Sequence, residues 1–283
     1  MGKAEATVAA YHADVADLVR AYAPRPAEDL NPRDLADYLQ ARARFEEWSP
    51  ATVRRHLQAI KAFYRYLVSD EGLRAPGPAE TLAEPAPEPH APHVIAEGEV
   101  RALFDYLEQR AAREEGSAER MDLALYGICY HAALLVSEAI GLTRDAVRGG
   151  PEVMELDVIG RRGEESRVTI GGEPARWLSR WLAERPAPRR KSHAPFVFIH
   201  PRTRVHTSRQ RAWDRLKRLA AAAGLPEDVA QQITPHTLRH SHAAHLAARA
   251  ASVADLRAAL RQHSPRHAAK YLAARDTQPE IGP

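Results

Sequence analysis

The chain of 283 residues contains a single cysteine, Cys129, and no long apolar run. One cysteine excludes an internal disulfide framework and a cysteine-based zinc cluster, and it fits a reducing compartment. No apolar stretch approaches the ~18 residues that a membrane-spanning helix needs, and no basic-plus-apolar signal segment opens the sequence. We therefore expect a soluble, cytoplasmic protein with no membrane partner.

Lysine is also scarce, because only five of the 40 basic residues are lysines and arginine supplies the rest. The net charge is +3, since 37 acidic residues are interspersed among them. Two explanations stay open, a generally arginine-rich composition and a nucleic-acid footprint. The placement of the arginines decides between them.

Proline is concentrated in one stretch of the chain. Six prolines fall in "LRAPGPAETLAEPAPEPHAPH", residues 73–93, where they prevent a continuous helix or strand and predict an extended, semi-rigid linker. A chain of this length can form two domains, each with its own core. We therefore expect a first domain over residues 1–72 and a second over residues 94–283.

The first domain is expected to be helical over residues 4–22, 31–45 and 49–69. Asn31-Pro32 and Ser49-Pro50 each supply a capping side chain followed by proline at the first helical position. One apolar stripe of the third helix predicts its core-facing side, and basic residues occupy its other faces. Four of these are candidate DNA contacts: Arg54, Arg55, Lys61 and Arg65. The alternative is that they are simply solvated.

The second domain is expected to be mainly helical with a small sheet. "VMELDVIG" (153–160) alternates apolar and polar residues and is joined by a basic turn to "SRVTIG" (166–171), which predicts a hairpin. "FVFI" (196–199) predicts a further apolar strand. Helices are expected over residues 96–113, 118–141, 173–184 and 208–223, and from starts near 234, 252 and 264.

The segment "ITPHTLRHSHAAHL", residues 233–246, holds a dense cluster of polar side chains. A helix that begins at Pro235 places His236 and Arg239 three residues apart on one face, where both can reach a single phosphate. Arginine offers a planar fork that matches phosphate oxygens, and histidine can donate to an oxygen or carry a proton. Taken alone, such a pair is more often structural.

The order of these elements resembles that of the tyrosine recombinases, which include the phage integrases and the Xer-type chromosome recombinases, over nearly the whole chain. The resemblance implies a mainly α fold, in which a helical, SAM-like core-binding domain precedes an α+β catalytic domain with a small antiparallel sheet. The segments that carry it are "SPATVRRHLQAIKAFYRYL" (49–67), "GEVRALFDYL" (98–107), "HAALLVSEAIGL" (131–142), "HTLRH" (236–240), and "LRQHS" (260–264) followed by Tyr271.

In that family a tyrosine hydroxyl attacks a DNA phosphodiester, leaving a 3′-phosphotyrosyl link and a free 5′-hydroxyl, with no metal or nucleotide cofactor. Arginines and imidazoles stabilise the negative charge of the phosphorane, and a hairpin lysine protonates the leaving oxygen. The resemblance implies Tyr271 as the nucleophile, His236 and Arg239 as phosphate ligands, His263 as the second histidine, and Arg161 at the lysine position. We add three arginines as candidate DNA contacts: Arg162, Arg209 and Arg211.

The sequence departs from the family pattern at positions that bear on catalysis. "ALLVSE" (133–138) places Leu135 where the family motif has its first arginine, and leucine cannot bind a phosphate. Arg161 replaces the lysine, and a guanidinium holds its proton more tightly than an ammonium does, which makes it a poor proton donor. Gln262 replaces a conformationally free glycine. His263 and Tyr271 are eight positions apart where the family usually has nine, and one residue turns a helical side chain by ~100°.

Together the departures predict a DNA-binding protein that holds duplex DNA between its domains and whose strand-transfer activity is lost or impaired. Two enzymatic alternatives stay open: an active site-specific recombinase that uses Tyr271, with Arg144 or Arg162 in place of the missing arginine, and a nicking-closing topoisomerase. The expected partner is double-stranded DNA in the nucleoid. Family members act as tetramers, so a homo-oligomer on DNA and a complex with a second recombinase are both open.

Overall fold

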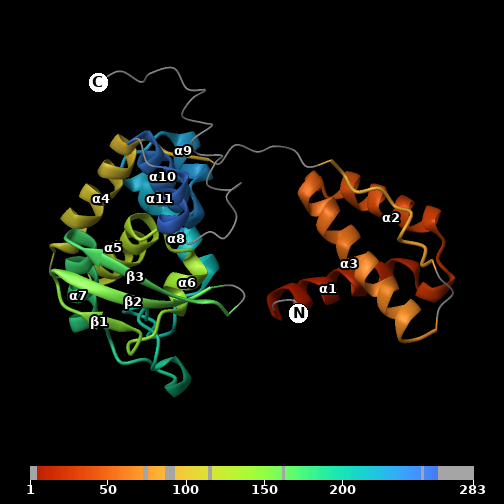
Figure 1. Cartoon of the computed structure of the whole chain (residues 1–283), viewed down its shortest axis with the longest axis horizontal. Helices are drawn as coiled ribbons and strands as arrows, with labels where there is room; N and C mark the ends of the chain where they lie inside the picture. The colour runs from red at the N-terminus through yellow and green to blue at the C-terminus, as the bar shows by residue number, and fades with distance from the viewer. Residues whose placement is uncertain are drawn as a thin grey trace. The chain divides into compact units, whose positions relative to one another are not determined.

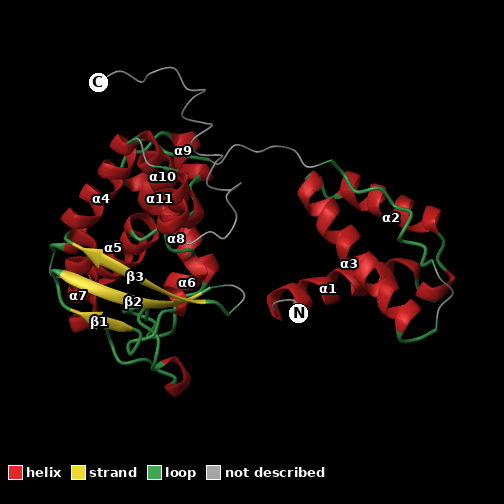
Figure 2. Cartoon of the chain, in the orientation of Figure 1, coloured by secondary structure: helices red, strands yellow, loops and turns green. Residues whose placement is uncertain are grey.

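The computed structural model describes residues 5–72, 76–86, 93–113, 117–160, 163–249 and 252–260. The chain divides into two compact units, Met1–Ala91 and Pro92–Pro283 (Figure 1). Figure 2 shows helices in the first unit and helices with a small sheet in the second. The predicted fold class, mainly helical with a small antiparallel sheet, is confirmed. No helix in the described ranges is long and apolar enough to cross a membrane.

The first unit packs its helices around one apolar core. Its described elements are α1 (Glu5–Tyr22), η1 (Ala27–Asp29), α2 (Pro32–Phe45) and α3 (Pro50–Ser69). The predicted starts of α2 and α3 are confirmed, because Asn31 Oδ1 accepts from the Asp34 N–H and Ser49 Oγ accepts from the Thr52 N–H. The apolar stripe of α3, which includes Leu57 and Ile60, is buried against α1 and α2.

Residues 76–86, which fall inside the predicted linker, pack on the first unit. Ala79 is fully buried and Leu82 contacts the same apolar core. A Cβ at Gly77 would lie 3.3 Å from the Cβ of Tyr64, so this segment approaches α3 closely because it has glycine there. The linker assignment for residues 73–93 as a whole stays a prediction, since 73–75 and 87–92 lie outside the described residues.

The second unit surrounds the buried helix α5 (Ser117–His131) with other helices and carries one small sheet (Figure 1). Strand β2 is central and pairs antiparallel with β1 and β3, and Met154, Leu156 and Val158 point from it into the core. The helices are α4 (Glu97–Ala111), α5 (Ser117–His131), α6 (Val136–Gly141), α7 (Glu173–Glu184), α8 (Arg209–Ala222), α9 (Glu227–Gln232), α10 (Pro235–Ala248) and α11 (Val253–Leu260). The shorter elements are η2 (Lys191–His193), β1 (Val147–Gly149), β2 (Val153–Ile159) and β3 (Glu165–Gly171).

The predicted continuous helix over residues 118–141 is wrong, because the chain breaks between α5 and α6. Ala133 adopts a φ of +48°, in the left-handed region, and the Leu134 N–H bonds back to the Ile128 carbonyl (3.3 Å). This left-handed residue ends α5 in the way that helix C-termini commonly end. The apolar character of the segment hid the break, since residues on both sides of it are buried.

The predicted strand "FVFI" is also wrong. Phe196 makes one isolated bridge to Thr143, and Ile199 makes one to His206, so the segment is buried without joining the sheet. The short elements β1 and α9 had no counterpart in the sequence-based expectation, because three and six residues are too few to show a period. The helix expected from position 264 lies outside the described residues.

Candidate nucleic-acid interface

A cleft of about 540 Å³ opens in the second unit where the first residues of α6, α8 and α10 meet. Side chains from all three helix starts line it, so segments about 100 residues apart in the sequence share one site. Peptide N–H groups at helix starts carry partial positive charge, which favours an anion. The lining residues are Leu135, Val136, Ser137, Arg209, Gln210, Trp213, Thr234, Pro235 and His236.

Leu135 is the N-cap residue of α6 and presents its apolar side chain to the cleft. Its N–H donates to Glu138 Oε2 (2.8 Å), which fixes the start of α6 directly after the left-handed turn at Ala133. The backbone position of residue 135, and with it the direction of its side chain, is therefore fixed by the α5–α6 turn. The family resemblance predicts an arginine at this position, and leucine brings no charge to the cleft.

Arg239 lies beneath this turn, and it is not a lining residue of the cleft. The side chain is 7% exposed, its Nη1 donates to the Ala133 carbonyl (2.5 Å), and the same nitrogen lies 3.8 Å from Glu138 Oε2. The buried guanidinium thus links the start of α10 to the α5–α6 turn. Its predicted role as a phosphate ligand stays a prediction, and a phosphate would share it with Glu138.

His236 is exposed at the start of α10 and lines the cleft. Its ring meets that of His240 edge-on, with the centroids 4.2 Å apart. Burial, followed by the charges of His236 and Arg239, lowers the pKa of His240 to about 4. His240 is therefore neutral at pH 7, and His236 is the imidazole of this pair that can reach a ligand in the cleft.

Arg209 and Arg211, both predicted DNA contacts, lie on different flanks of α8. Arg209 lines the cleft with His236, whereas Arg211 lines a separate pocket on the far side of the helix. Arg144 is not among the lining residues of the cleft, and its role in place of an arginine at position 135 stays a prediction. The remaining predicted residues of this unit lie outside the described residues: Arg161, Arg162, His263 and Tyr271, together with Gln262.

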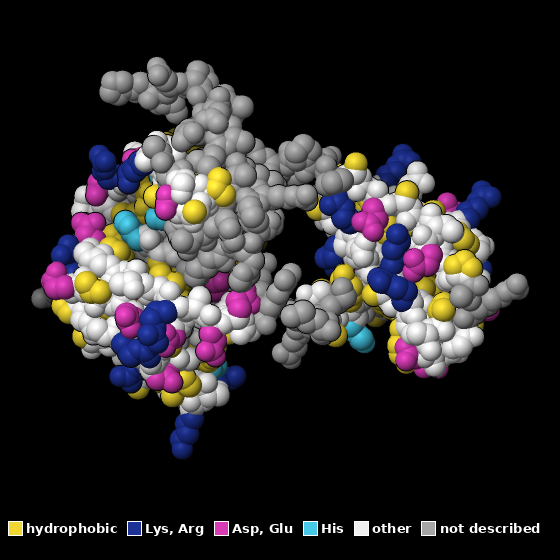
Figure 3. Space-filling view, in the orientation of Figure 1, with side chains coloured by type: hydrophobic (Ala, Val, Ile, Leu, Met, Phe, Trp, Pro, Cys, Tyr) yellow, Lys and Arg dark blue, Asp and Glu magenta, His cyan; other side chains and the backbone are white. Residues whose placement is uncertain are grey.

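The predicted basic face of α3 is already engaged within the first unit. Arg54 Nη2 donates to the Pro85 carbonyl (2.9 Å). Lys61 Nζ lies 3.8 Å from Glu84, and Arg65 Nε lies 3.9 Å from Glu80. On the face of this unit shown in Figure 3, dark blue Lys and Arg side chains alternate with magenta Asp and Glu side chains.

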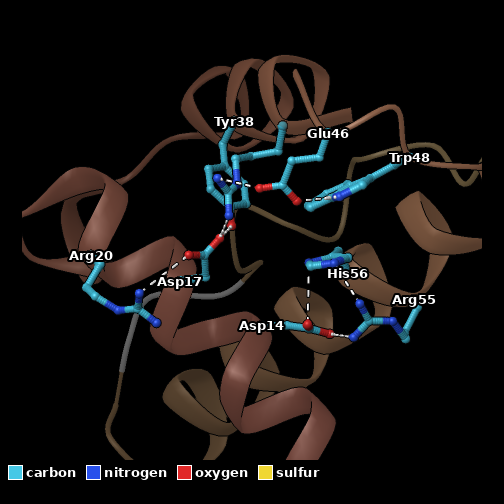
Figure 4. A network of polar contacts seen from close by, with 9 residues as sticks. Asp14, Asp17, Arg20, Tyr38, Glu46, Trp48, Arg55 and His56 are labelled. Carbon is cyan, nitrogen blue, oxygen red and sulfur yellow. Dashed lines mark hydrogen bonds and ion pairs between the residues drawn. The ribbon is translucent and has the colours of Figure 1, made fainter. Parts of the chain in front are cut away.

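Arg55 belongs to a polar network between α1 and α3, shown in Figure 4. Asp14, which is buried, accepts an ion-pair hydrogen bond from Arg55, and Arg55 Nη2 also donates to His56 Nε2 (2.7 Å). His56 stacks on Trp48 with the ring centroids 3.8 Å apart, and burial lowers its pKa. For Arg55 to bind DNA, it would have to leave or share these partners.

The cleft contains polar residues that the sequence did not single out. Trp213 follows Arg209 by four positions, one turn along α8, and is 42% exposed, while Gln210 and Ser137 complete the polar lining. The i, i+4 spacing of Arg209 and Trp213 on a helix was the signal in the sequence that could have predicted a shared surface. No group of three or more His, Cys, Asp or Glu side chains within the described ranges is arranged to hold a metal ion.

Comparisons with family models match almost the whole chain. Residues 93–278 match the model of the "Phage integrase family", and residues 1–72 match the model of the "Phage integrase, N-terminal SAM-like domain". Similar curated proteins include "Tyrosine recombinase XerC" of Erythrobacter litoralis, 32% identical over 87% of this chain and 74% of that protein. "Tyrosine recombinase XerD" of Xanthomonas campestris pv. campestris is 32% identical over 87% of this chain and 75% of that protein.

Solved structures share the fold at lower identity. The XerH site-specific recombinase bound to palindromic difH substrate has a TM-score of 0.68 at 16% identity, over 88% of this chain and 70% of that chain. A lambda integrase dimer bound to a COC′ core site has a TM-score of 0.71 at 14% identity, over 100% of this chain and 75% of that chain. At these identities the likeness concerns the fold.

Replacing Arg239 with alanine is expected to destabilise the second unit by ~3–5 kcal/mol, because it removes a buried cation from Glu138 and a donor from the Ala133 carbonyl. Urea denaturation followed by tryptophan fluorescence measures this. Arg176→Ala, at an exposed position of α7, is the matched control and should change stability by less than ~0.5 kcal/mol. Equal stability of the two variants would contradict the bracing role of Arg239.

The second unit is expected to lose stability as the pH falls from 7.5 to 5. Burial, together with nearby cationic groups, lowers the pKa of both His240 and His242 to about 4, from an ordinary value of 6.5. The unfolded chain therefore binds more protons between pH 6.5 and 4, so the stabilisation is complete above 6.5 and is lost through this window. After allowance for partial exposure, the loss should be about 1–2 kcal/mol for the pair. Urea titrations at several pH values test this, and His242→Gln should flatten the profile. A free energy of unfolding that stays level or rises toward pH 5 would contradict it.

Proposed function

Because the chain belongs to the phage integrase family of tyrosine recombinases, we propose that it binds double-stranded DNA and that its strand-transfer activity is lost or strongly impaired. One observation carries the proposal. The cleft combines a guanidinium, an imidazole and helix N-termini with an apolar residue, Leu135, at the position of the family's first arginine. Such a cleft can hold a phosphodiester and is poorly equipped to cleave it.

Binding is supported by the donors at the cleft. Arg209 and His236 are both exposed and line it, at the starts of α8 and α10. An arginine and two helix N-termini favour a phosphate through their positive charge. The solved XerH and lambda integrase structures of the same fold are complexes with a recombination substrate and a core site, which fits a DNA ligand here.

The impairment follows from the charge balance of the reaction. When a tyrosine oxygen bonds to phosphorus and the 5′-oxygen leaves, the phosphorane carries more negative charge than the diester. A missing charge-stabilising donor typically costs ~10²–10³ in rate. Leu135 supplies no donor, and the nearby Arg239 is already paired with Glu138 and the Ala133 carbonyl. In this proposal Arg161, at the position of the family lysine, is a poor proton source for the leaving oxygen.

An active recombinase is the second candidate, and one observation favours it. Arg209 lines the same cleft as Leu135 and His236, so a guanidinium is available near the missing arginine. In this alternative Tyr271 is the nucleophile, His263 assists at the phosphate, and Arg209 takes over charge stabilisation.

We further propose that the first unit contributes Arg54, Arg55, Lys61 and Arg65 to the DNA contact. DNA phosphates would replace Glu80 and Glu84 as partners of Arg65 and Lys61. In the second unit Arg162, on the turn of the hairpin, joins them. On DNA the chain would be nucleoid-associated, and self-association there or pairing with a second recombinase would follow the dimer seen for lambda integrase.

Arg209→Ala and His236→Ala are each expected to weaken binding to a short duplex of arbitrary sequence, Arg209→Ala by about tenfold, because a phosphate contact is lost. The slope of log affinity against log salt should fall by about one for Arg209→Ala. Gel shifts at several salt concentrations measure both quantities. Arg176→Ala, an exposed arginine of α7 that does not line the cleft, is the control. Affinity that is flat across salt, or equal losses in all three variants, would contradict binding at the cleft.

The wild-type chain is expected to form no covalent adduct with duplex DNA above the level of Tyr271→Phe. The duplexes are first selected for binding from a random pool and are then nicked, so that they contain a sequence that the chain binds. Denaturing gels detect a phosphotyrosyl adduct. An adduct that is abundant in wild type, lost in Tyr271→Phe and lost in Arg209→Ala would replace the first candidate with the second.

A further inference from the structure

A second pocket of about 290 Å³ lies on the flank of α8 that faces away from the cleft. Its walls come from α8, from the N-terminal half of α5 and from the segment 200–207. None of its lining residues lines the cleft, so the two sites are separate. The proposed DNA contact at the cleft leaves this pocket without a role.

Arg211, Arg215 and Arg218 reach the pocket from one side of α8, at spacings of four and three residues. Arg215 is neutralised, because its Nε donates to Asp122 Oδ2 (2.8 Å) and its Nη2 donates to Glu119 Oε1 (3.1 Å). These bonds hold the middle arginine in place and engage both nearby carboxylates.

The two outer arginines lack a carboxylate partner within the described ranges. Arg218 Nε donates to the Asp214 carbonyl (3.2 Å), and the guanidinium of Arg211 makes no hydrogen bond or ion pair there. The surrounding sequence strengthens the imbalance, since residues 185–218 contain eleven arginines and lysines and one acid, Asp214. The pocket therefore carries uncompensated positive charge.

The wall opposite α8 adds a neutral donor. His200 Nδ1 accepts from the Thr203 N–H (3.3 Å), which leaves the proton of a neutral imidazole on Nε2. Burial, and then the charges of Arg211, Arg215 and Arg202, lower the pKa of His200 and keep it neutral at pH 7.

The floor is apolar, with Met121, Leu125 and Ala212 from α5 and α8. A recess that combines an apolar floor with a few convergent polar groups is typical of a small-molecule site. Asp122 also lines the pocket, but its carboxylate is engaged by Arg215. The remaining polar groups are donors and cations, a set that matches an oxyanion. We propose that this pocket binds a phosphate group, held by Arg211, Arg218 and His200. The phosphate is carried by a free small molecule or by a nucleic-acid backbone, and the two sources share this chemistry.

Thermal unfolding in inorganic phosphate, against sodium chloride of equal ionic strength, tests the site without DNA. A ligand that binds only the folded chain should raise the melting temperature, here by ~2–4 °C at tenfold excess over Kd. Arg211→Ala and Arg218→Ala should each lose most of this rise, whereas Arg176→Ala, at an exposed position of α7 outside both the pocket and the cleft, should keep it. Phosphate also stabilises proteins without binding a site, but that effect would persist in every variant.

The proposal is overturned if Arg211→Ala and Arg218→Ala keep the rise, or if Arg176→Ala loses it to the same extent as they do. DNA gel shifts with the same variants then assign the source of the phosphate. If Arg211→Ala binds DNA with unchanged affinity, the phosphate belongs to a free small molecule. If Arg211→Ala loses as much DNA affinity as Arg209→Ala, the phosphate belongs to the DNA backbone. Since the thermal assay contains no DNA, failure here leaves the proposed DNA contact at the cleft untouched, and the reverse also holds.

Discussion

The buried guanidinium of Arg239 is the contact on which the cleft depends. It connects α10 to the turn between α5 and α6 through the Ala133 carbonyl and Glu138, and Glu138 in turn accepts from the Leu135 N–H. This chain of bonds fixes where α6 begins and which residue faces the cleft at position 135. A charged group that is nine-tenths buried holds its place only when paired. The starts of α6 and α10 are therefore held together by these bonds, and the start of α8 supplies the rest of the cleft lining.

The division of roles among the arginines explains a composition that is basic without a large net charge. Arg215 and Arg239 are paired with buried or half-buried carboxylates and support the fold, and Arg55 pairs with Asp14 in the same way. Arg209, at the mouth of the cleft, is exposed. Arginine suits both uses, because its planar fork can form several bonds at once and its charge survives burial. A count of arginines in the sequence cannot separate the two groups, since only the position of the carboxylates distinguishes them.

Much of the fold could be predicted, because it rests on local signals. Asn31-Pro32, Ser49-Pro50 and Thr234-Pro235 each begin a helix, and the alternation in residues 153–160 marks a strand. The break at Ala133 escaped prediction because a left-handed alanine in an apolar run has no sequence signature. The site was only partly readable for a similar reason. Helical spacing alone put His236 and Arg239 on one face, whereas the structure has only His236 lining the cleft. Whether Arg239 points to the cleft or to Glu138 depends on a turn a hundred residues away.

The central claim is that the cleft keeps its phosphate contact and lacks one charge at position 135. The most direct test measures covalent adduct formation by Leu135→Arg on nicked duplex that was first selected for binding. Leu135→Gln is the neutral control of similar length. Restored charge at the start of α6 should produce a Tyr271-dependent adduct that wild type and the glutamine variant do not form above background. Adduct formation that is equally high in wild type and in Leu135→Arg would contradict the account.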